Sequence, residues 1–366
     1  MPEHEPTNAC LTIDLDALAH NHAVLKREAG GAEVAPVLKA DAYGLGIGPV
    51  GRRLWAEGAR RFFVARLAEG EALRTHLGPD RPAAICILDG FTAAAGPRLA
   101  QAGLTPVLLS LPQVSAAAAF AAQRGAALPV VLHVDTGMNR QGLSLDDARA
   151  LALSTDRLHG LDVTLVMSHL GSASSPQSPR NARQLQRFLE ARALFPEAPA
   201  SLAASAGIFL GGDYLFDVVR PGVSLFGGGP LERPDGRLKA AATLTAPILG
   251  IRAVAPGEAI GYGESVTAEA PLRVATVAAG YADGVIRAAK AGGQAWFAGA
   301  PRRLLVVNMD LSVIDLGDTP ATVGELVELL GPNAQLDDLA AAAGTVAHEI
   351  LVRLSSRAER VYLGGA

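Results

Sequence analysis

A lysine stands at the end of a short apolar run in the segment Pro-Val-Leu-Lys-Ala-Asp-Ala-Tyr-Gly-Leu-Gly, residues 36–46. The run at 34–38 is typical of a buried strand, which would deliver the amine of Lys39 to the rim of a sheet. A tight turn follows, rich in small residues and carrying one aromatic hydroxyl, that of Tyr43. A lysine amine at a rim is a candidate for covalent or proton-transfer chemistry, although a lone lysine at a turn is more often simply solvated.

Other polar residues directly follow later apolar runs. Each has an ordinary explanation when taken alone, since a capped Asp-Thr-Gly turn, a hydrogen-bonded histidine, a helix-capping serine and an arginine in a surface ion pair are all common. Strand ends in a parallel barrel meet at one rim, so these residues would form a constellation there. Its members are Lys39, the segment 135–140 that ends in Arg140, His169, Ser205 and the segment 220–222 that begins with Arg220.

Eight short apolar runs alternate with amphipathic, alanine-rich segments between Asp14 and Phe226. Such alternation favours parallel β–α units, and eight units predict an α/β fold with an N-terminal (β/α)8 barrel of the TIM type. The apolar runs are 34–38, 62–65, 83–88, 105–109, 129–134, 161–167, 201–203 and 216–219. The helical segments are 18–28, 51–57, 67–75, 114–122 and 182–194.

After Phe226 the pattern changes to a glycine-rich connector at 227–229 and short strand-like runs broken by turns. This spacing predicts a compact, mostly antiparallel C-terminal β domain. The strand-like runs are 244–254, 259–262, 272–278, 303–307, 313–316, 323–329, 349–353 and 361–363, and one helix is expected at 336–343. We expect residues 13–232 to form the barrel and residues 238–366 to form the C-terminal domain. An N-terminal strand near 8–12 is expected to join this second domain.

The composition excludes several classes of protein. A chain of 366 residues with 49% hydrophobic residues favours two folded domains. A net charge of −4 gives no electrostatic case for nucleic acid or an anionic membrane surface, and no apolar run reaches the roughly 18 residues of a membrane span. Cys10 and Cys86 are too few for a disulfide framework. We therefore expect a cytoplasmic protein with no nucleic-acid, membrane or metal partner.

Nine blocks of sequence carry a family resemblance that covers the chain from about residue 10 to 363. They are PVLKADAYGLG (36–46), HVDTGMNRQG (133–142), MSHL (167–170), ASAGIFLG (204–211), DVVRPGVSLFG (217–227), IGYGE (260–264), GYADG (280–284), VVNMD (306–310) and EILVRLSSRAERVY (349–362). Together they resemble the alanine racemase family. The resemblance implies an isomerase that depends on pyridoxal 5'-phosphate, has the type III fold of such enzymes and interconverts L- and D-alanine for peptidoglycan synthesis or alanine catabolism.

The resemblance assigns the cofactor contacts and one catalytic base. Lys39 would hold the cofactor as a Schiff base and, once the substrate releases it, would act as a base. The phosphate would be bound by Tyr43, Ser205 and the backbone N–H groups of Gly222 and Val223. A dianion suits a turn of small residues.

The resemblance also assigns the groups around the cofactor ring and the second base. Arg220 would donate to the pyridine nitrogen, and His169 would pack against the ring. A permanent cation keeps that nitrogen unprotonated, which favours proton exchange over transamination. Racemisation needs a second base on the opposite face of a planar carbanion, and Tyr262 matches it. Because the usual pKa of tyrosine is about 10, the site must stabilise a phenolate.

Three further positions would contact the substrate. Arg140 and the backbone of Met309 would bind the carboxylate, and Tyr281 would narrow the entrance.

Several other positions depart from the family pattern. His133 stands where many relatives carry a lysine that becomes carbamylated and pairs with Arg140. An imidazole cannot form a carbamate, so Arg140 must be oriented in another way. The other departures are Ala204, Val306, Asn308, Ser356, Ala358 and Glu359.

The resemblance further implies a homodimer in which each C-terminal domain covers the barrel of the partner, so that the active sites are shared. Alternatives on the same plan are a racemase for a larger substrate such as serine, a decarboxylase, and a cofactor-binding protein without activity. Decarboxylases of this plan usually carry an acidic partner for the ring nitrogen and a late cysteine, whereas this chain has Arg220 and two early cysteines. Non-catalytic relatives lack Tyr262 and its domain.

Overall fold

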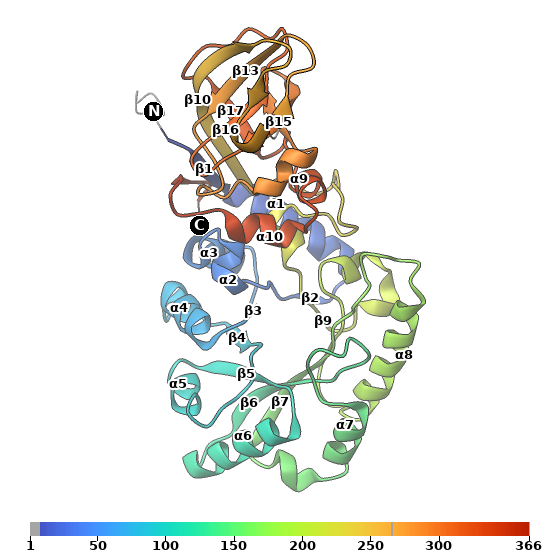
Figure 1. Cartoon of the computed structure of the whole chain (residues 1–366). Coiled ribbons are helices and arrows are strands. Elements are labelled where there is room, and N and C mark those ends of the chain that lie inside the picture. Colours follow the sequence, from blue (N-terminus) through green and yellow to red (C-terminus); the bar gives the residue numbers. More distant parts are fainter. Residues whose placement is uncertain (1–7, 265, 366) are drawn as a thin grey trace. The chain divides into compact units, whose positions relative to one another are not determined.

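The structure is a computed structural model that describes residues 8–264 and 266–365 (Figure 1). Contacts divide the chain into two compact units. One unit, here called the barrel unit, consists of residues 21–42 and 46–225. The other, here called the β unit, consists of residues 8–20, 43–45 and 226–365. The short segment 43–45, which begins with the last residue of α2 (Lys39–Tyr43), therefore belongs to the β unit.

Eight parallel strands form the barrel unit, in the order that the apolar runs predict. Strands β3 to β8 pair in sequence as a six-stranded sheet, and β2 pairs with β9. Parallel bridges between Val37 and Phe63 and between Ala204 and Arg220 join the two sheets, which closes the ring. The strands are β2 (Glu33–Val34), β3 (Arg61–Val64), β4 (Ala84–Ile87), β5 (Leu104–Leu108), β6 (Leu128–His133), β7 (Leu161–Met167), β8 (Ala200–Ser201) and β9 (Val218–Val219).

Helices separate most of these strands and lie outside the ring (Figure 1). Their ends follow ordinary capping chemistry: in α6 the Ser110 hydroxyl accepts a hydrogen bond from the backbone N–H of Gln113, and Gly125 ends the helix with φ 63°. The sequence pattern missed α5 and α7, which are too short to show a clear periodicity. The helices are α1 (Leu15–Glu28), α3 (Ile47–Ala56), α4 (Leu67–Leu77), α5 (Gly96–Gln101), α6 (Leu111–Arg124), α7 (Leu145–Ala152) and α8 (Pro179–Ala193).

Side chains from successive strands fill the inside of the barrel. The cluster is fully buried and consists of Ala35, Phe63, Cys86, Val107, Val131, Leu165, Met167 and Val218. Full burial of a large apolar side chain stabilises the fold by roughly 1.5–3 kcal/mol, so this interior anchors the strand ends firmly. The polar groups that follow these strands are therefore presented from a rigid wall.

The β unit is built around one long strand, β10 (Ala242–Val254). Its first half pairs with β1 (Cys10–Asp14) and β17 (Leu326–Leu330), and its second half pairs with β13 (Leu272–Val277), all antiparallel. Strands β13 and β17 are also connected through β16, β15 and β14 in the same sheet. The pairing of β10 with both of them therefore closes a second ring. The remaining strands are β11 (Ala259–Ile260), β12 (Val266–Thr267), β14 (Gln294–Phe297), β15 (Ala300–Val307), β16 (Ser312–Asp315) and β18 (Glu359–Leu363).

Two helices complete the β unit, α9 (Leu336–Ala342) and α10 (Ala347–Arg353). The strand-like run expected at 349–353 is wrong, because it forms the second of these helices. Its aliphatic residues Ile350 and Leu351 are buried on one helical face, while Glu349 and Arg353 form an exposed ion pair one turn apart. None of the helices in residues 8–264 and 266–365 is long and apolar enough to cross a membrane.

Candidate active site

Lys39 begins a left-handed turn at the end of the first barrel strand. The turn, labelled α2 (Lys39–Tyr43), has φ values of 55°, 56°, 54° and 57° at Ala40, Asp41, Ala42 and Tyr43. Non-glycine residues in this conformation cost roughly 1–2 kcal/mol each, so the surrounding structure must impose it. The Asp41 side chain accepts a hydrogen bond from the N–H of Ile47 at 2.7 Å, and the Asp41 carbonyl accepts one from Gly46 at 2.9 Å.

The amine of Lys39 is more easily deprotonated than an ordinary lysine. Burial lowers its pKa, the positive charge of Arg140 lowers it further, and the carboxylate of Glu69 partly opposes both. The residue as a whole is exposed to solvent, so this desolvation is partial. A lysine with these properties has a larger neutral fraction, which is the form that attacks carbonyl carbons and accepts protons.

Arg220 is buried and is hydrogen-bonded to polar groups at the ends of neighbouring strands. Its guanidinium donates to the hydroxyl of Ser201 and to the carbonyl of Ser168, both at 2.5 Å. The Ser201 hydroxyl in turn donates to the carbonyl of Val218 at 2.5 Å. Burial lowers the pKa of Arg220 to about 10, so the group remains a cation at neutral pH. The network fixes a buried positive charge in one orientation.

Two histidines beside Arg220 are held neutral. Burial lowers the pKa of His169 well below its usual value, and Arg220 and Arg140 lower it further. Its Nδ1 lies 3.5 Å from the Arg220 guanidinium. Burial and the same two arginines also lower the pKa of His133, to about 4, although Asp135 opposes them. Neither imidazole adds charge to the site at neutral pH.

The loop that carries Arg140 is shaped by Asp135. One carboxylate oxygen of Asp135 accepts hydrogen bonds from the N–H groups of Gly137 and Met138 at 2.9 and 2.8 Å, and the other accepts one from Asn139 at 2.9 Å. Burial alone would raise the pKa of Asp135, but these backbone donors outweigh it and the pKa is lowered. This carboxylate is a structural group that orders the loop, as the turn pattern allowed.

Ser205 lies between two short 3-10 helices, η2 (Ala206–Phe209) and η4 (Val223–Phe226). Its buried hydroxyl accepts hydrogen bonds from the backbone N–H groups of Gly222 at 2.9 Å and Ser224 at 3.3 Å. The starts of both helices therefore meet at one point, where backbone N–H groups favour an anion. The sequence placed Ser205, Gly222 and Val223 near a phosphate, and the structure brings them together.

The barrel unit places two arginines and the Lys39 amine at the same end of its strands. Lys39, Arg140 and Arg220 act on one another or on His169 electrostatically, and Asp135 is already engaged with its own loop. Such a donor set fits pyridoxal phosphate, which brings an aldehyde for the amine, a phosphate for the Ser205 region and a ring nitrogen for Arg220. Among the described residues, no cluster of histidine, cysteine or carboxylate groups could hold a metal ion.

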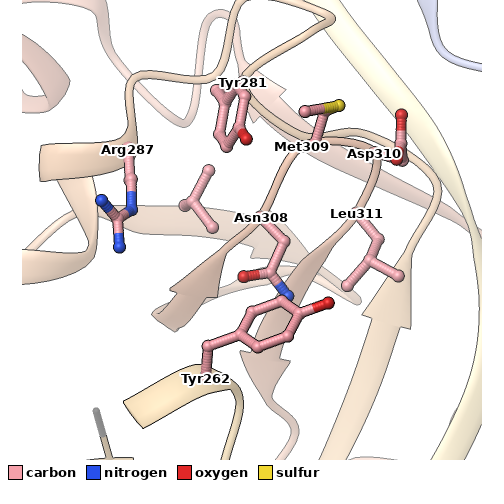
Figure 2. Close-up of a pocket in the computed structure, with 8 residues that line it drawn as sticks. Tyr262, Tyr281, Arg287, Asn308, Met309, Asp310 and Leu311 are labelled. Atoms are coloured by element: carbon pink, nitrogen blue, oxygen red, sulfur yellow. The ribbon is translucent and has the colours of Figure 1, made fainter.

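The β unit carries an open pocket of about 820 Å³ lined by aromatic, apolar and polar side chains. Tyr262 follows Gly261, which has φ 80°, and its side chain is 83% exposed. Figure 2 shows Asn308 projecting between the rings of Tyr262 and Tyr281 in this view, with Met309 beyond it. The lining residues are Tyr262, Tyr281, Arg287, Val307, Asn308, Met309, Asp310 and Leu311.

Two chain segments that line this pocket interlock through their backbones. The N–H groups of Tyr281 and Ala282 donate to the carbonyls of Asn308 and Met309, both at 2.9 Å. A side chain at Gly280 would lie 2.3 Å from the Asn308 carbonyl, so only glycine permits this approach. The carboxylate of Asp283 accepts two hydrogen bonds from Arg357, which ties the C-terminal segment to the same place.

Tyr43 and Tyr362 lie in the β unit. The ring of Tyr43 packs against Phe226 with centroids 5.0 Å apart, and burial raises the pKa of its hydroxyl. Tyr362 donates to the carbonyl of Leu45 at 3.0 Å, so it supports the segment that follows Tyr43.

The sequence missed two residues that touch the proposed machinery, Ser201 beside Arg220 and Glu69 beside the Lys39 turn. Only Glu69 left a signal. It is the third residue of helix α4, a position where a carboxylate commonly accepts backbone N–H groups.

The chain combines a parallel α/β barrel, with Lys39 at the end of its first strand, and a separate antiparallel β unit. Comparison with known proteins supplies the family. Residues 13–230 match the N-terminal domain of alanine racemase and residues 241–362 match its C-terminal domain. The chain belongs to the alanine racemase family.

Relatives and solved structures agree over the whole chain. An alanine racemase of Rhizobium meliloti is 43% identical over 100% of this chain and 99% of its own. A catabolic alanine racemase of Mesorhizobium japonicum is 42% identical over 98% and 94% of the two chains, and a biosynthetic one of Agrobacterium fabrum is 42% identical over 96% and 93%. The crystal structure of alanine racemase from Bartonella henselae with covalently bound pyridoxal phosphate has a TM-score of 0.91, 32% identity and coverage of 98% of this chain and 100% of that chain.

Proposed function

We propose that this protein is a pyridoxal-phosphate-dependent isomerase that interconverts L- and D-alanine. The observation that carries the proposal is the Lys39 amine, whose lowered pKa and cationic surroundings suit a cofactor with an aldehyde and a phosphate. Membership of the alanine racemase family over both domains supports the choice of reaction and substrate. We also propose that residues 13–232 are the cofactor-binding part and that residues 238–366 supply the second half of the site.

Bound pyridoxal phosphate withdraws electrons from the α-carbon of an amino acid and so makes its C–H bond acidic. Lys39 holds the cofactor and then, as a neutral amine, takes or returns a proton on one face of that carbon. Ser205 and the N–H groups near Gly222 and Val223 hold the phosphate. Tyr43 contributes its hydroxyl to the same group.

Arg220 and His169 would favour proton exchange at the α-carbon over other reactions of the cofactor. The guanidinium remains protonated because its pKa is about 10, so Arg220 would hold the ring nitrogen by donating a hydrogen bond and would not transfer its proton. A ring nitrogen held unprotonated in this way would favour proton exchange at the α-carbon over transamination. The neutral ring of His169 packs beside the cofactor without adding charge.

Tyr262 takes or returns the proton on the opposite face. Its side chain is 83% exposed within one chain, which suits a residue that completes the site of a second subunit. Arg140 and the backbone of Met309 bind the substrate carboxylate, while Tyr281 limits the space for the side chain. The protein would act as a homodimer with shared sites, and its two free thiols, Cys10 and Cys86, accord with a cytoplasmic setting.

The test is a racemisation assay with a panel of L-amino acids and added pyridoxal phosphate. Alanine should have the highest kcat/KM, because one extra methylene in a tight pocket costs about 1–3 kcal/mol. Borohydride reduction should trap the cofactor on the Lys39 peptide, and Lys39→Ala should abolish both trapping and activity. A label on another lysine, or a higher kcat/KM for serine, lysine or arginine, would contradict the proposal.

A further inference from the structure

The backbone on both sides of Lys39 is tied to the next β–α unit of the barrel. On the N-terminal side, the N–H of Leu38 donates to the carbonyl of Phe63 in β3 at 2.8 Å. On the C-terminal side, the N–H of Ala40 donates to the carboxylate of Glu69 in α4 at 2.6 Å. Lys39 is therefore held between two anchors that both belong to residues 61–77.

Glu69 is engaged on both of its oxygens. One accepts the Ala40 N–H, and the other accepts the N–H groups of Ala65 and Arg66 at 2.8 and 3.0 Å. These two residues connect the end of β3 to the start of α4, so a single half-buried carboxylate joins three backbone donors from two segments. Hydrogen bonds to an ionised acceptor are stronger than neutral ones, so this junction is a stiff one.

The Ala40 N–H is the first amide of the left-handed turn, which is the strained part of the site. Four successive non-glycine residues have φ between 54° and 57°, and they would relax toward the right-handed region without external anchors. The Glu69 carboxylate also opposes the effects of burial and Arg140 on the pKa of Lys39. Glu69 therefore acts on the Lys39 amine in two ways: its hydrogen bond to Ala40 holds the position of the turn, and its negative charge acts on the pKa.

We propose that Glu69 is a positioning residue for Lys39, which locks the left-handed turn onto the second β–α unit of the barrel. The inference rests on the proposed role of Lys39, and it adds a residue that acts only through Lys39. A displacement of about 1 Å in a reacting group can reduce a rate by about 100-fold, so the hold on the turn affects the chemical step more than substrate binding.

The chain supplies a matched control in Glu71. It lies on the same helix two residues further on, and its carboxylate pairs with Arg98 at 2.5 Å instead of contacting the Lys39 turn. Glu69→Ala removes all acceptors, Glu69→Gln leaves one carbonyl oxygen for two sets of donors, and Glu71→Ala removes only the pairing with Arg98. All three are made in the full chain loaded with pyridoxal phosphate.

We expect Glu69→Ala to lower kcat for alanine by about 10- to 100-fold with KM changed less than about 2-fold. Glu69→Gln should lie between this variant and the wild type, and Glu71→Ala should match the wild type. Hydrogen exchange followed by mass spectrometry should show the same order, with faster exchange in the peptide that contains residues 40–43. The exchange measurement keeps its meaning even if the substrate or reaction differs from the proposal.

Three results would overturn the inference. Exchange that accelerates only in residues 67–77 would make Glu69 a helix cap and nothing more. A raised KM with unchanged kcat would mean that the side chain acts on the substrate. An equal effect of Glu69→Ala and Glu71→Ala would mean that any lost charge on α4 has this effect. If Glu69→Ala does not fold, the comparison of Glu69→Gln with Glu71→Gln decides the matter in the same way.

Discussion

At the scale of single residues, the site combines groups whose charges are set by burial. His133 is an example, because its pKa of about 4 makes it a neutral imidazole between Arg140 and Arg220 at neutral pH. By the family resemblance, it stands where many relatives carry a lysine that becomes carbamylated. Imidazole forms no stable carbamate, and Arg140 follows a segment whose backbone N–H groups Asp135 binds.

The first prediction follows from that difference. Removal of bicarbonate and carbon dioxide from the assay should leave kcat/KM of the wild type unchanged. His133→Lys should lose activity in bicarbonate-free buffer and regain part of it when bicarbonate is added. Burial and the two neighbouring arginines disfavour the protonated amine of this lysine and favour the neutral amine or its negatively charged carbamate. A clear requirement for bicarbonate in the unmodified protein would show that another lysine carries a carbamate.

The sequence located most of the site because chemistry in a barrel follows strand ends. Lys39, His169, Ser205 and Arg220 each come just after an apolar run, and the structure brings the four to the same end of the barrel unit. The left-handed turn was not predictable, since Ala40 and Asp41 ordinarily prefer the right-handed region. One of the contacts that hold it, between Ala40 and Glu69, joins residues 29 positions apart, and no local pattern reveals such a contact.

At the scale of elements, the glycine-rich segment at 227–229 is held by specific backbone contacts and is not only a flexible connector. The N–H of Gly229 donates to the buried carboxylate of Asp337 in α9 at 2.8 Å. A side chain at Gly229 would lie only 1.8 Å from the carbonyl of Arg233. The close approach of two backbones explains the glycine better than a need for flexibility.

Gly229→Ala should therefore destabilise the protein. The added methyl group must displace backbone, which typically costs 1–3 kcal/mol or more, and we expect a lower Tm by several degrees. Gly236→Ala is the control, because nothing lies within 4 Å of a side chain there and φ is not positive. Thermal unfolding by circular dichroism measures both, and equal Tm values for the two variants would contradict the argument.

A second prediction at this scale concerns α1. His22 is 4% exposed, and its Nε2 has no hydrogen-bond partner among the residues that the structure describes. Burial is the largest cause of its lowered pKa, which Glu57 opposes and Lys26 lowers further. The folded state therefore holds the neutral ring, whereas the unfolded state takes up a proton below about pH 6.5. Stability is fully present above that pH and is lost as the pH falls toward the folded-state pKa.

His22→Leu should thus weaken the dependence of stability on pH. The difference in urea midpoint between about pH 7.5 and pH 5 should be smaller in the variant than in the wild type, although His133 and His169 still contribute in the same direction. His159→Gln alters an exposed histidine and should leave the dependence unchanged. An identical loss of stability at acid pH in wild type and His22→Leu would show that His22 titrates normally.

Element boundaries show why the sequence succeeded in one half of the chain more than in the other. All eight barrel strands were predicted because buried parallel strands are continuous apolar runs. In the β unit, α10 was taken for a strand because Ile350, Leu351 and Val352 form a run that is apolar in either conformation. Strand β14, Gln294–Phe297, was missed because its four residues carry little pattern of their own.

At the scale of the whole molecule, the two proposed bases lie in different compact units. Lys39 belongs to the barrel unit, and Tyr262 belongs to the β unit, where it lies exposed beside Tyr281 and Met309. Family and fold could be predicted because the matching blocks extend through both units. The assembly of subunits could not be derived from residue spacing, since contacts between two copies leave no periodic pattern in one chain.

The last prediction tests whether the active site is shared between two subunits. Lys39→Ala and Tyr262→Phe should each be almost inactive alone, because each removes one of the two bases. When they are unfolded together and refolded as a mixture, a mixed dimer with shared sites has one site that lacks both bases and one that is intact. Random pairing makes about half of the dimers mixed, so roughly a quarter of the wild-type sites should return. Activity per total protein chain, relative to refolded wild type, measures that fraction, and each variant refolded alone is the control. If mass spectrometry of the intact assemblies detects mixed dimers and no activity returns, Lys39 and Tyr262 serve the site of one chain, and the shared-site arrangement is wrong.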